Sequence, residues 1–266
     1  MAKQRPAPQR SFGIFAEGST YTDLRGRKPF EELWSELCGR VSAPPVPTIH
    51  VFGISKAQIV ALKDDVGEKK PDREPLDLLI RRMHERHGFD IAVVAFDRIQ
   101  QNQHVPSDCL RQEVSFVLER MKERALLPEV FREEAERLLN YYRLHRKTPR
   151  GPGRPPRGCL DIIYMDPMFE GLFACDELTV RQALIPSGLP KSKRSLWPAF
   201  DMNARYPDRD ILGRAVPLAE AEVRAQVRGD MKSNKHGWAL YILRKALDDA
   251  ALLRHPIADR LRTILA

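Results

Sequence analysis

The sequence predicts an α/β fold in which a parallel sheet is covered by helices on both faces. Short apolar runs of strand length alternate with longer segments of helical periodicity. Three of these runs each end directly before an acidic residue: Phe12–Ala16 before Glu17, Ile91–Phe96 before Asp97, and Leu160–Met165 before Asp166. The carboxyl ends of parallel strands are where open α/β sheets bind ligands. We therefore expect these three acids at one edge of the sheet.

The amino-terminal part of the chain is expected to contain a disordered arm, a strand and a helix. Residues 1–10 combine basic residues with proline and glutamine and show no periodicity, which is typical of disorder. Gly18 lets the backbone turn sharply after the first strand. Pro29 begins a helix whose apolar residues recur at i, i+3, i+4 and i+7: Phe30, Leu33, Trp34 and Leu37.

The middle of the chain continues the alternation. Thr48–Phe52 is the second predicted strand, and Ser55 is expected to cap a short helix after it. A charged loop at 63–73 precedes a helix that starts at Pro75. Two further helices are predicted, at about 107–121 and 128–146.

The carboxyl-terminal half contains two irregular segments. Residues 147–158 are rich in proline, glycine and arginine and can form neither a helix nor an inner strand. A helical pattern covers 168–175, whereas residues 185–217 show no clear period and are predicted to form a long, partly ordered loop. The remainder is predicted as helices at about 218–228, 237–252 and 256–265, which complete a single domain over residues 11–266.

The composition favours a polyanionic partner. Lysine and arginine number 44 against 36 aspartates and glutamates, which gives a net charge of +8. This balance favours nucleic acid as partner, although a basic protein without such a partner has the same composition. Four scattered cysteines form no CxxC pair, so neither a zinc site nor a disulfide framework is expected. No apolar run reaches the length of a membrane span and no signal peptide is recognisable, which predicts a cytoplasmic protein.

The acids at the strand ends are candidates for a metal site. Mg²⁺ and Mn²⁺ prefer oxygen ligands, and Mg²⁺ is usually held by one or two carboxylates together with substrate phosphates. A carboxylate in such a site can also act as a general base toward water. The alternative is that each acid caps the helix after its strand, because acids are favoured at N-caps. The recurrence of an acid at three strand ends favours the metal site.

Three segments resemble one protein family. Glu17-Gly18 after a strand, with an acid at a later strand end, is similar to the Toprim fold of topoisomerases, primases and overcoming-lysogenization-defect nucleases. Residues 168–176, MFEGLFACD, look like a degenerate Glu-Leu-Glu-Ala-Trp-Phe-x-x-Asp motif. Residues 230–237, DMKSNKHG, resemble the closing segment of the Toprim-like domain-of-unknown-function family 4276. Members of that family are often encoded beside AAA-type ATPases.

The resemblance implies a Mg²⁺- or Mn²⁺-dependent nuclease with a Toprim-like fold and additional C-terminal helices. Glu17 and Asp97 would be catalytic, with Glu17 as ligand or base, and Lys232 would stabilise charge that develops on the phosphate. An ATPase partner and a role in defence against mobile DNA are also implied. The implied metal ligands are Glu17, Asp97, Asp166, Glu170 and Asp176.

The chain departs from the family pattern at two acids. Toprim proteins usually carry Asp-x-Asp at the second site, where this chain has Asp97-Arg98-Ile99, and Met168 replaces the first acid of the later motif. Asp166 could substitute for a missing acid. Because loss of acids weakens cation binding, the alternative function is a catalytically degenerate nucleic-acid-binding or regulatory subunit of an ATPase complex. A further alternative is an assembly subunit that forms homo-oligomers through its C-terminal helices.

One basic cluster lies in the Pro/Arg-rich loop. Its core, Arg150-Gly-Pro-Gly-Arg154-Pro-Pro-Arg157, is similar to an AT-hook, which inserts arginine side chains into the minor groove of DNA. A flexible basic linker is the alternative, since Pro-rich segments usually act as spacers.

A second basic cluster lies in the long loop. Lys191, Lys193 and Arg194 precede Trp197, and this combination suits phosphate contact with base stacking. The alternative is that Trp197 anchors the loop to the core. Lys235 is a further candidate for nucleic-acid contact, and His236 beside it is the histidine that we single out for testing.

Overall fold

The computed structural model describes most of the chain, and its account covers residues 10–18, 28–55, 58–59, 74–97, 114–115, 117–119, 121–122, 126–144, 158–165, 169–174, 176–200, 206–245, 247–253 and 255–266. Residues 1–9, most of the predicted helix at 107–121 and most of the Pro/Arg-rich loop lie outside these ranges.

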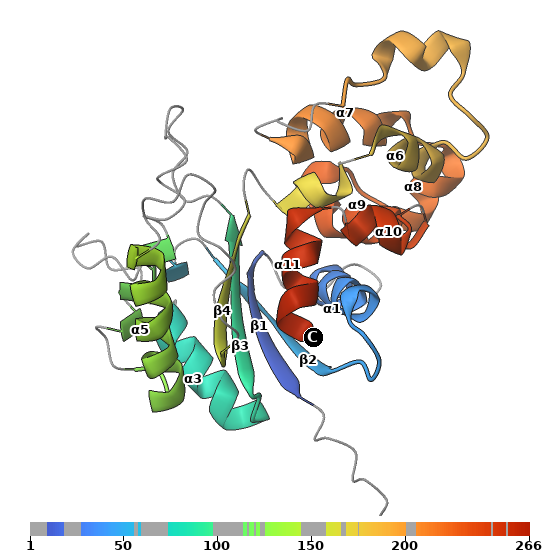
Figure 1. The fold of residues 1–266 in the computed structure, drawn as a ribbon. Coiled ribbons are helices and arrows are strands. Elements are labelled where there is room, and N and C mark those ends of the chain that lie inside the picture. The colour runs from blue at the N-terminus through green and yellow to red at the C-terminus, as the bar shows by residue number, and fades with distance from the viewer. Residues whose placement is uncertain are drawn as a thin grey trace, which may run out of the picture.

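A parallel four-stranded sheet forms the centre of the described residues (Figure 1). The strands lie in the order β2-β1-β3-β4, so β1 and β3 are central. Every neighbouring pair is parallel, and this agrees with the α/β, Toprim-like fold with extra C-terminal helices. The strand bounds are β1 (Ser11–Glu17), β2 (Thr48–Ile54), β3 (Ile91–Asp97) and β4 (Leu160–Met165).

One face of the sheet is covered by α3 (Leu76–His87) and α5 (Glu129–Leu144), at the left of Figure 1. Gly88, in the left-handed conformation with φ 63°, ends α3 by donating its N–H to the His84 carbonyl at 2.8 Å. The core on this face combines side chains of alternate strand positions with those of both helices, among them Phe15, Val94, Phe96, Ile80 and Leu138. This alternation is what a sheet buried on both sides requires.

The opposite face is covered by α1 (Pro29–Val41) and α11 (Pro256–Leu265). The helices α9 (Met231–Lys245) and α10 (Asp249–Leu253) pack against α1 and extend the same core. Arg40 of α1 joins these layers. Its guanidinium donates to the carbonyls of Leu243 and Leu247, which lie at and beyond the end of α9, and pairs with Asp249. The arginine therefore satisfies carbonyls that the helix end leaves without a partner in the helix.

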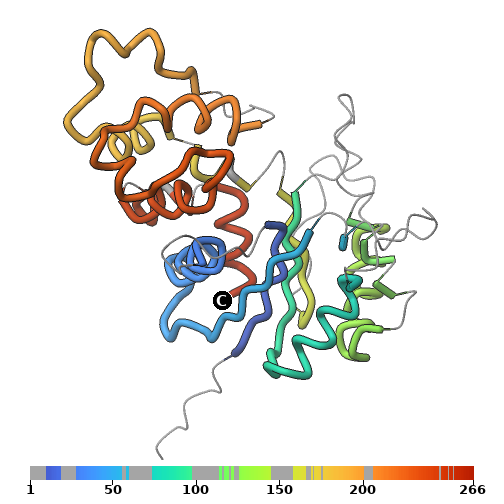
Figure 2. The backbone as a smooth tube through the Cα atoms, turned by 180° about the vertical axis from the view of Figure 1, so that it is seen from behind, coloured from blue at the N-terminus to red at the C-terminus, as the bar shows by residue number. Residues whose placement is uncertain are grey.

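A group of short helices extends beyond the carboxyl ends of the strands, on the α1 side (Figure 2). Much of the predicted loop at 185–217 is ordered here as short helical turns, which carry too few residues for a periodic pattern. The elements are η1 (Phe169–Phe173), α6 (Glu177–Leu184), η2 (Lys191–Leu196), η3 (Asp208–Leu212), α7 (Gly213–Ala215), η4 (Val216–Leu218) and α8 (Ala221–Val227).

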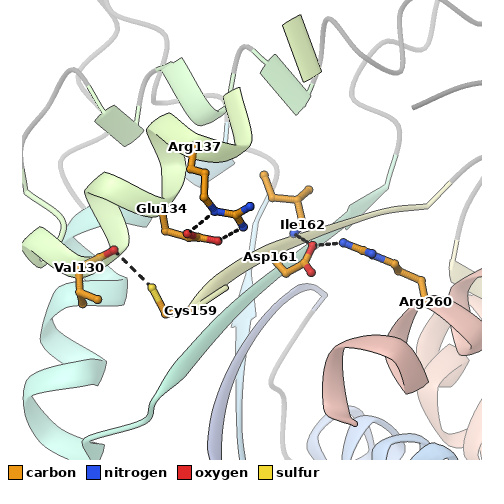
Figure 3. Close-up of polar contacts among 7 residues, drawn as sticks. All are labelled: Val130, Glu134, Arg137, Cys159, Asp161, Ile162 and Arg260. Carbon is orange, nitrogen blue, oxygen red and sulfur yellow. Dashed lines mark hydrogen bonds and ion pairs between the residues drawn. The ribbon is translucent and has the colours of Figure 1, made fainter. Parts of the chain in front are cut away.

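A polar network ties the amino end of β4 to both helical layers (Figure 3). Arg260 of α11 forms an ion pair with Asp161 of β4, whose carboxylate also accepts the N–H of Ile162 at 2.7 Å. On the other side, the Cys159 thiol before β4 donates to the Val130 carbonyl of α5 at 3.3 Å, and Arg137 pairs with Glu134 within α5. Burial raises the pKa of Asp161, and the Arg260 guanidinium opposes this shift. The network lies at the opposite end of the strands from the candidate site.

Candidate active site at the carboxyl edge of the sheet

The strand order creates a switch point between β1 and β3. The chain passes from β1 to β2 on one side of β1, and then returns to place β3 on the other side. The helices of these two connections consequently cover opposite faces of the sheet. In α/β proteins, ligands bind outside the carboxyl ends of the strands at such a switch point. Glu17 ends β1 and Asp97 ends β3, so both predicted acids lie at this switch point.

Glu17 and Asp97 are joined through the backbone. The N–H of Asp97 donates to Oε2 of Glu17 at 3.1 Å. Strand alternation directs Glu17 toward the face of Phe15, and directs Asp97 toward the face of Ala95. The Glu17 carboxylate reaches the end of β3 nonetheless. The two acids therefore lie beside each other while their side chains leave the sheet in opposite directions.

Asp97 is also held by the segment that follows β4. Its Oδ1 accepts the N–H of Phe169, the first residue of η1, at 2.9 Å, and only 6% of Asp97 is exposed. The Phe169 ring stacks on Trp34 of α1 with centroids 4.7 Å apart and planes 6° apart. The stacked pair thereby fixes the N–H that binds the acid.

The later acids divide into three cases. Asp166 lies outside the described residues, although Met165 before it pairs in register with Asp97. Glu170 lies in η1 next to Phe169, and its side chain is outside the description. Asp176 is the N-cap of α6 and accepts hydrogen bonds from the Leu178 N–H at 2.9 Å and the Thr179 hydroxyl at 3.1 Å. Helix capping therefore accounts for Asp176.

Phe30 links the turn after β1 to the C-terminal part of the chain. A Cβ at Gly18 would lie 2.2 Å from the Phe30 ring, and Gly18 has φ 156°, so this position requires glycine. The same ring meets the imidazole of His236 edge to face, with centroids 4.9 Å apart. His236 is 2% exposed. The segment that resembles the family's closing motif thus lies next to the Glu17-Gly18 turn.

Asn234 fixes the shape of this segment. It interrupts α9 with φ −144° and ψ 49°. Its Nδ2 donates to the carbonyls of Val227 and Arg228, each at 3.0 Å, and its Oδ1 accepts the Gly237 N–H at 3.1 Å. The last bond is an N-cap, so the regular part of α9 begins at Lys235.

The two lysines of the segment differ in exposure: Lys232 is exposed and Lys235 is half-buried. Asp230 is engaged locally, because its carboxylate accepts the Ser233 N–H at 2.8 Å and the Ser233 hydroxyl at 2.9 Å. These hydrogen bonds lower the pKa of Asp230.

The basic clusters have separate positions. Arg150, Arg154 and Arg157 lie outside the described residues. Lys191 and Arg194 are exposed on η2, whereas Lys193 is half-buried. Hydrogen bonds from Ser187 lower the pKa of Glu220, and the charge of Lys193 adds to this shift. Trp197 is half-buried and stacks with Phe200, with centroids 6.0 Å apart. The structure thus brings the two strand-end acids together and separates η2 from them.

The described residues fit a cation only in part. Within them, no group of three or more His, Cys, Asp or Glu side chains is arranged to hold a metal ion. Glu17 and Asp97 each accept a backbone hydrogen bond, and carboxylate oxygens are ligands that Mg²⁺ prefers. Two carboxylates suffice for Mg²⁺ when substrate phosphates supply further ligands.

Sequence reasoning missed Phe30, Asn234 and Asp77 as residues of this region. Phe30 reads as an ordinary core residue of an amphipathic helix. Asn234 carries a weak signal, since an Asn three residues before Gly237 suits an N-cap. Asp77 is fully buried in the first turn of α3, which begins near the end of β2, where Gln58 Nε2 donates to the Glu74 carbonyl at 3.1 Å.

Comparison of the chain with protein families, curated proteins and solved structures found no match. The resemblance to the Toprim-like family therefore stays a prediction from the three motifs. Among the described helices, none combines the length and apolar character needed to cross a membrane.

Proposed function

We propose that the protein is a metal-dependent phosphodiesterase that cleaves nucleic acid at the carboxyl edge of its sheet. The observation that carries the proposal is the meeting of Glu17 and Asp97 at the β1–β3 switch point. Ligands of α/β proteins gather at such points. The net charge of +8 suits a polyanionic substrate.

Glu17 and Asp97 would hold Mg²⁺ or Mn²⁺ at the ends of β1 and β3, which the hydrogen bond from the Asp97 N–H to the Glu17 carboxylate joins. The bound cation supplies Lewis-acid polarisation of the phosphate. The Phe169 N–H keeps the Asp97 carboxylate oriented. Lys232, exposed on a segment that Asn234 fixes, would contact the phosphate as negative charge develops. Asp166 and Glu170 follow the end of β4 and are proposed as additional ligands.

A second candidate function is nucleic-acid binding without cleavage. It is favoured by the opposite directions of the Glu17 and Asp97 side chains, which separate potential ligands, and by the capping contacts of Asp176. For either function, we propose an AAA-type ATPase as partner and a role in defence against mobile DNA, as the resemblance to the Toprim-like family implies. The second function predicts salt-sensitive binding without cleavage, even with such an ATPase present.

The decisive experiment measures nicking of supercoiled DNA, and cleavage of RNA, with Mg²⁺ or Mn²⁺. We expect activity in the wild type and its loss in Glu17→Gln and in Asp97→Asn. Glu85→Gln is the matched control, because Glu85 is an exposed acid near the carboxyl end of α3 that pairs with Arg81. Equal cleavage by the wild type and Glu17→Gln would remove Glu17 from the mechanism. Binding without cleavage in the wild type would favour the second function.

A further inference from the structure

The η2 helix forms the outer tip of the group of short helices. In Figures 1 and 2 this segment, coloured gold, lies at the far end of that group from the sheet. The stretch from Leu189 to Phe200 contains three basic residues and no acidic residue. Leu189, Trp197 and Phe200 pack against the core, so the stretch is anchored at both ends while its middle is exposed.

The geometry of η2 separates its three cations into two sets. Side chains at i and i+3 of a 3₁₀-helix eclipse each other, and the rise over three residues is about 6 Å. Lys191 and Arg194 therefore lie on one side of η2, and both are exposed. Lys193 lies on a different side of η2 and is half-buried.

We infer that Lys191 and Arg194 bind two successive phosphates of one nucleic-acid strand, and that Lys193 does not take part. The separation of the pair along η2 is comparable with the spacing of neighbouring phosphates on a strand. Arginine and lysine are the usual phosphate-binding side chains. The two side chains would bind the sugar-phosphate backbone of the nucleic acid, so this contact confers no preference for particular bases. It lies away from Glu17 and Asp97, and it holds substrate rather than cleaving it.

The inference rests on the proposed function in taking nucleic acid as the substrate, but its test does not depend on cleavage. Fluorescence anisotropy would measure the affinity of the full chain for a labelled single-stranded oligonucleotide in EDTA, over a series of salt concentrations. The variants are Lys191→Gln/Arg194→Gln and the control Lys193→Gln. Lys191 and Arg194 are exposed and Lys193 is half-buried. Circular dichroism would confirm that each variant is folded.

We expect the double variant to lose several-fold in affinity and to lower the slope of log K against log salt by about 1.4, or about 0.7 per lost phosphate contact. Lys193→Gln should leave the slope unchanged. An unchanged slope in the double variant, an equal loss in Lys193→Gln, or no binding by the wild type would each overturn the inference. Competition by polyglutamate that is as strong as competition by unlabelled oligonucleotide would also overturn the inference, because it would indicate an acidic protein partner. Unchanged cleavage in Glu17→Gln would contradict the proposed function and leave this inference standing.

Discussion

The carboxylate of Glu17 accepts the backbone N–H of Asp97 at 3.1 Å, although β1 and β3 direct the two side chains toward opposite faces of the sheet. This hydrogen bond joins the carboxyl ends of the two central strands, β1 and β3. It also makes Glu17 both a structural acceptor and a candidate ligand. The two roles depend on different properties of the side chain, so they can be separated by substitution.

Replacing Glu17 by Gln should remove the charge and keep an oxygen acceptor. We expect the free energy of unfolding of Glu17→Gln to stay within about 0.5 kcal/mol of the wild type, while its Mn²⁺ affinity falls by about tenfold or more. Glu17→Ala should instead lose about 1–2 kcal/mol, because the Asp97 N–H loses its partner. Urea unfolding and Mn²⁺ titration measure the two effects. Equal Mn²⁺ affinity in Glu17→Gln and the wild type would contradict the ligand role.

Gly18→Ala should destabilise the protein by about 2 kcal/mol or more, because the new methyl group meets the Phe30 ring in a backbone conformation that disfavours side chains. The matched control is Gly39→Ala. Gly39 lies inside α1, and a Cβ there has nothing within 4 Å. The control should gain about 0.5–1 kcal/mol from helix propensity. Chemical denaturation compares them, and a Gly18→Ala variant as stable as the wild type would refute the close approach of Phe30.

Arg260→Met should cost about 3–5 kcal/mol at neutral pH, since it leaves the Asp161 carboxylate buried without its cation. Burial already raises the pKa of Asp161, and loss of Arg260 removes an interaction that lowers it. Protonation neutralises the orphaned acid, so the deficit should shrink as the pH falls. The double variant Asp161→Leu/Arg260→Met should recover most of the stability. Failure of the double variant to recover would show that the pair itself stabilises the attachment of α11 to β4.

The stability of the protein should fall as the pH is lowered from about 6.5 to about 4 through His255. Burial lowers the pKa of His255 from 6.5 to about 4, and its Nδ1 accepts the Ile257 N–H at the start of α11. The unfolded chain therefore binds this proton at a higher pH than the folded chain does, so the stabilisation is complete above the unfolded pKa. The loss should be on the order of 3 kcal/mol and level off below the folded pKa. His255→Asn keeps a capping acceptor without the titration and should flatten this part of the pH profile. Urea unfolding as a function of pH measures it.

The central strands β1 and β3 were predictable because each contains a short apolar run that both helical layers bury. Glu17 and Asp97 could be placed at the same edge of the sheet, because the carboxyl ends of parallel strands lie at one edge. The contacts of Asp97 with Phe169 and of Phe30 with His236 could not, because they join segments that are distant in sequence. Asp176 illustrates a different limit. A carboxylate before a helix suits capping and metal binding equally well, and only its hydrogen bonds distinguish the two roles.

The packing of α11 against α1 and β4 has a consequence for synthesis on the ribosome. The core on this side unites residues from the first strand, such as Phe12, with residues near the end of the chain, such as Leu261 and Leu265. This apolar surface of the nascent sheet therefore stays partly uncovered until α11 has left the exit tunnel. Chains that stop before α11 should accordingly aggregate or require a chaperone, whereas chains that include α11 bury that surface.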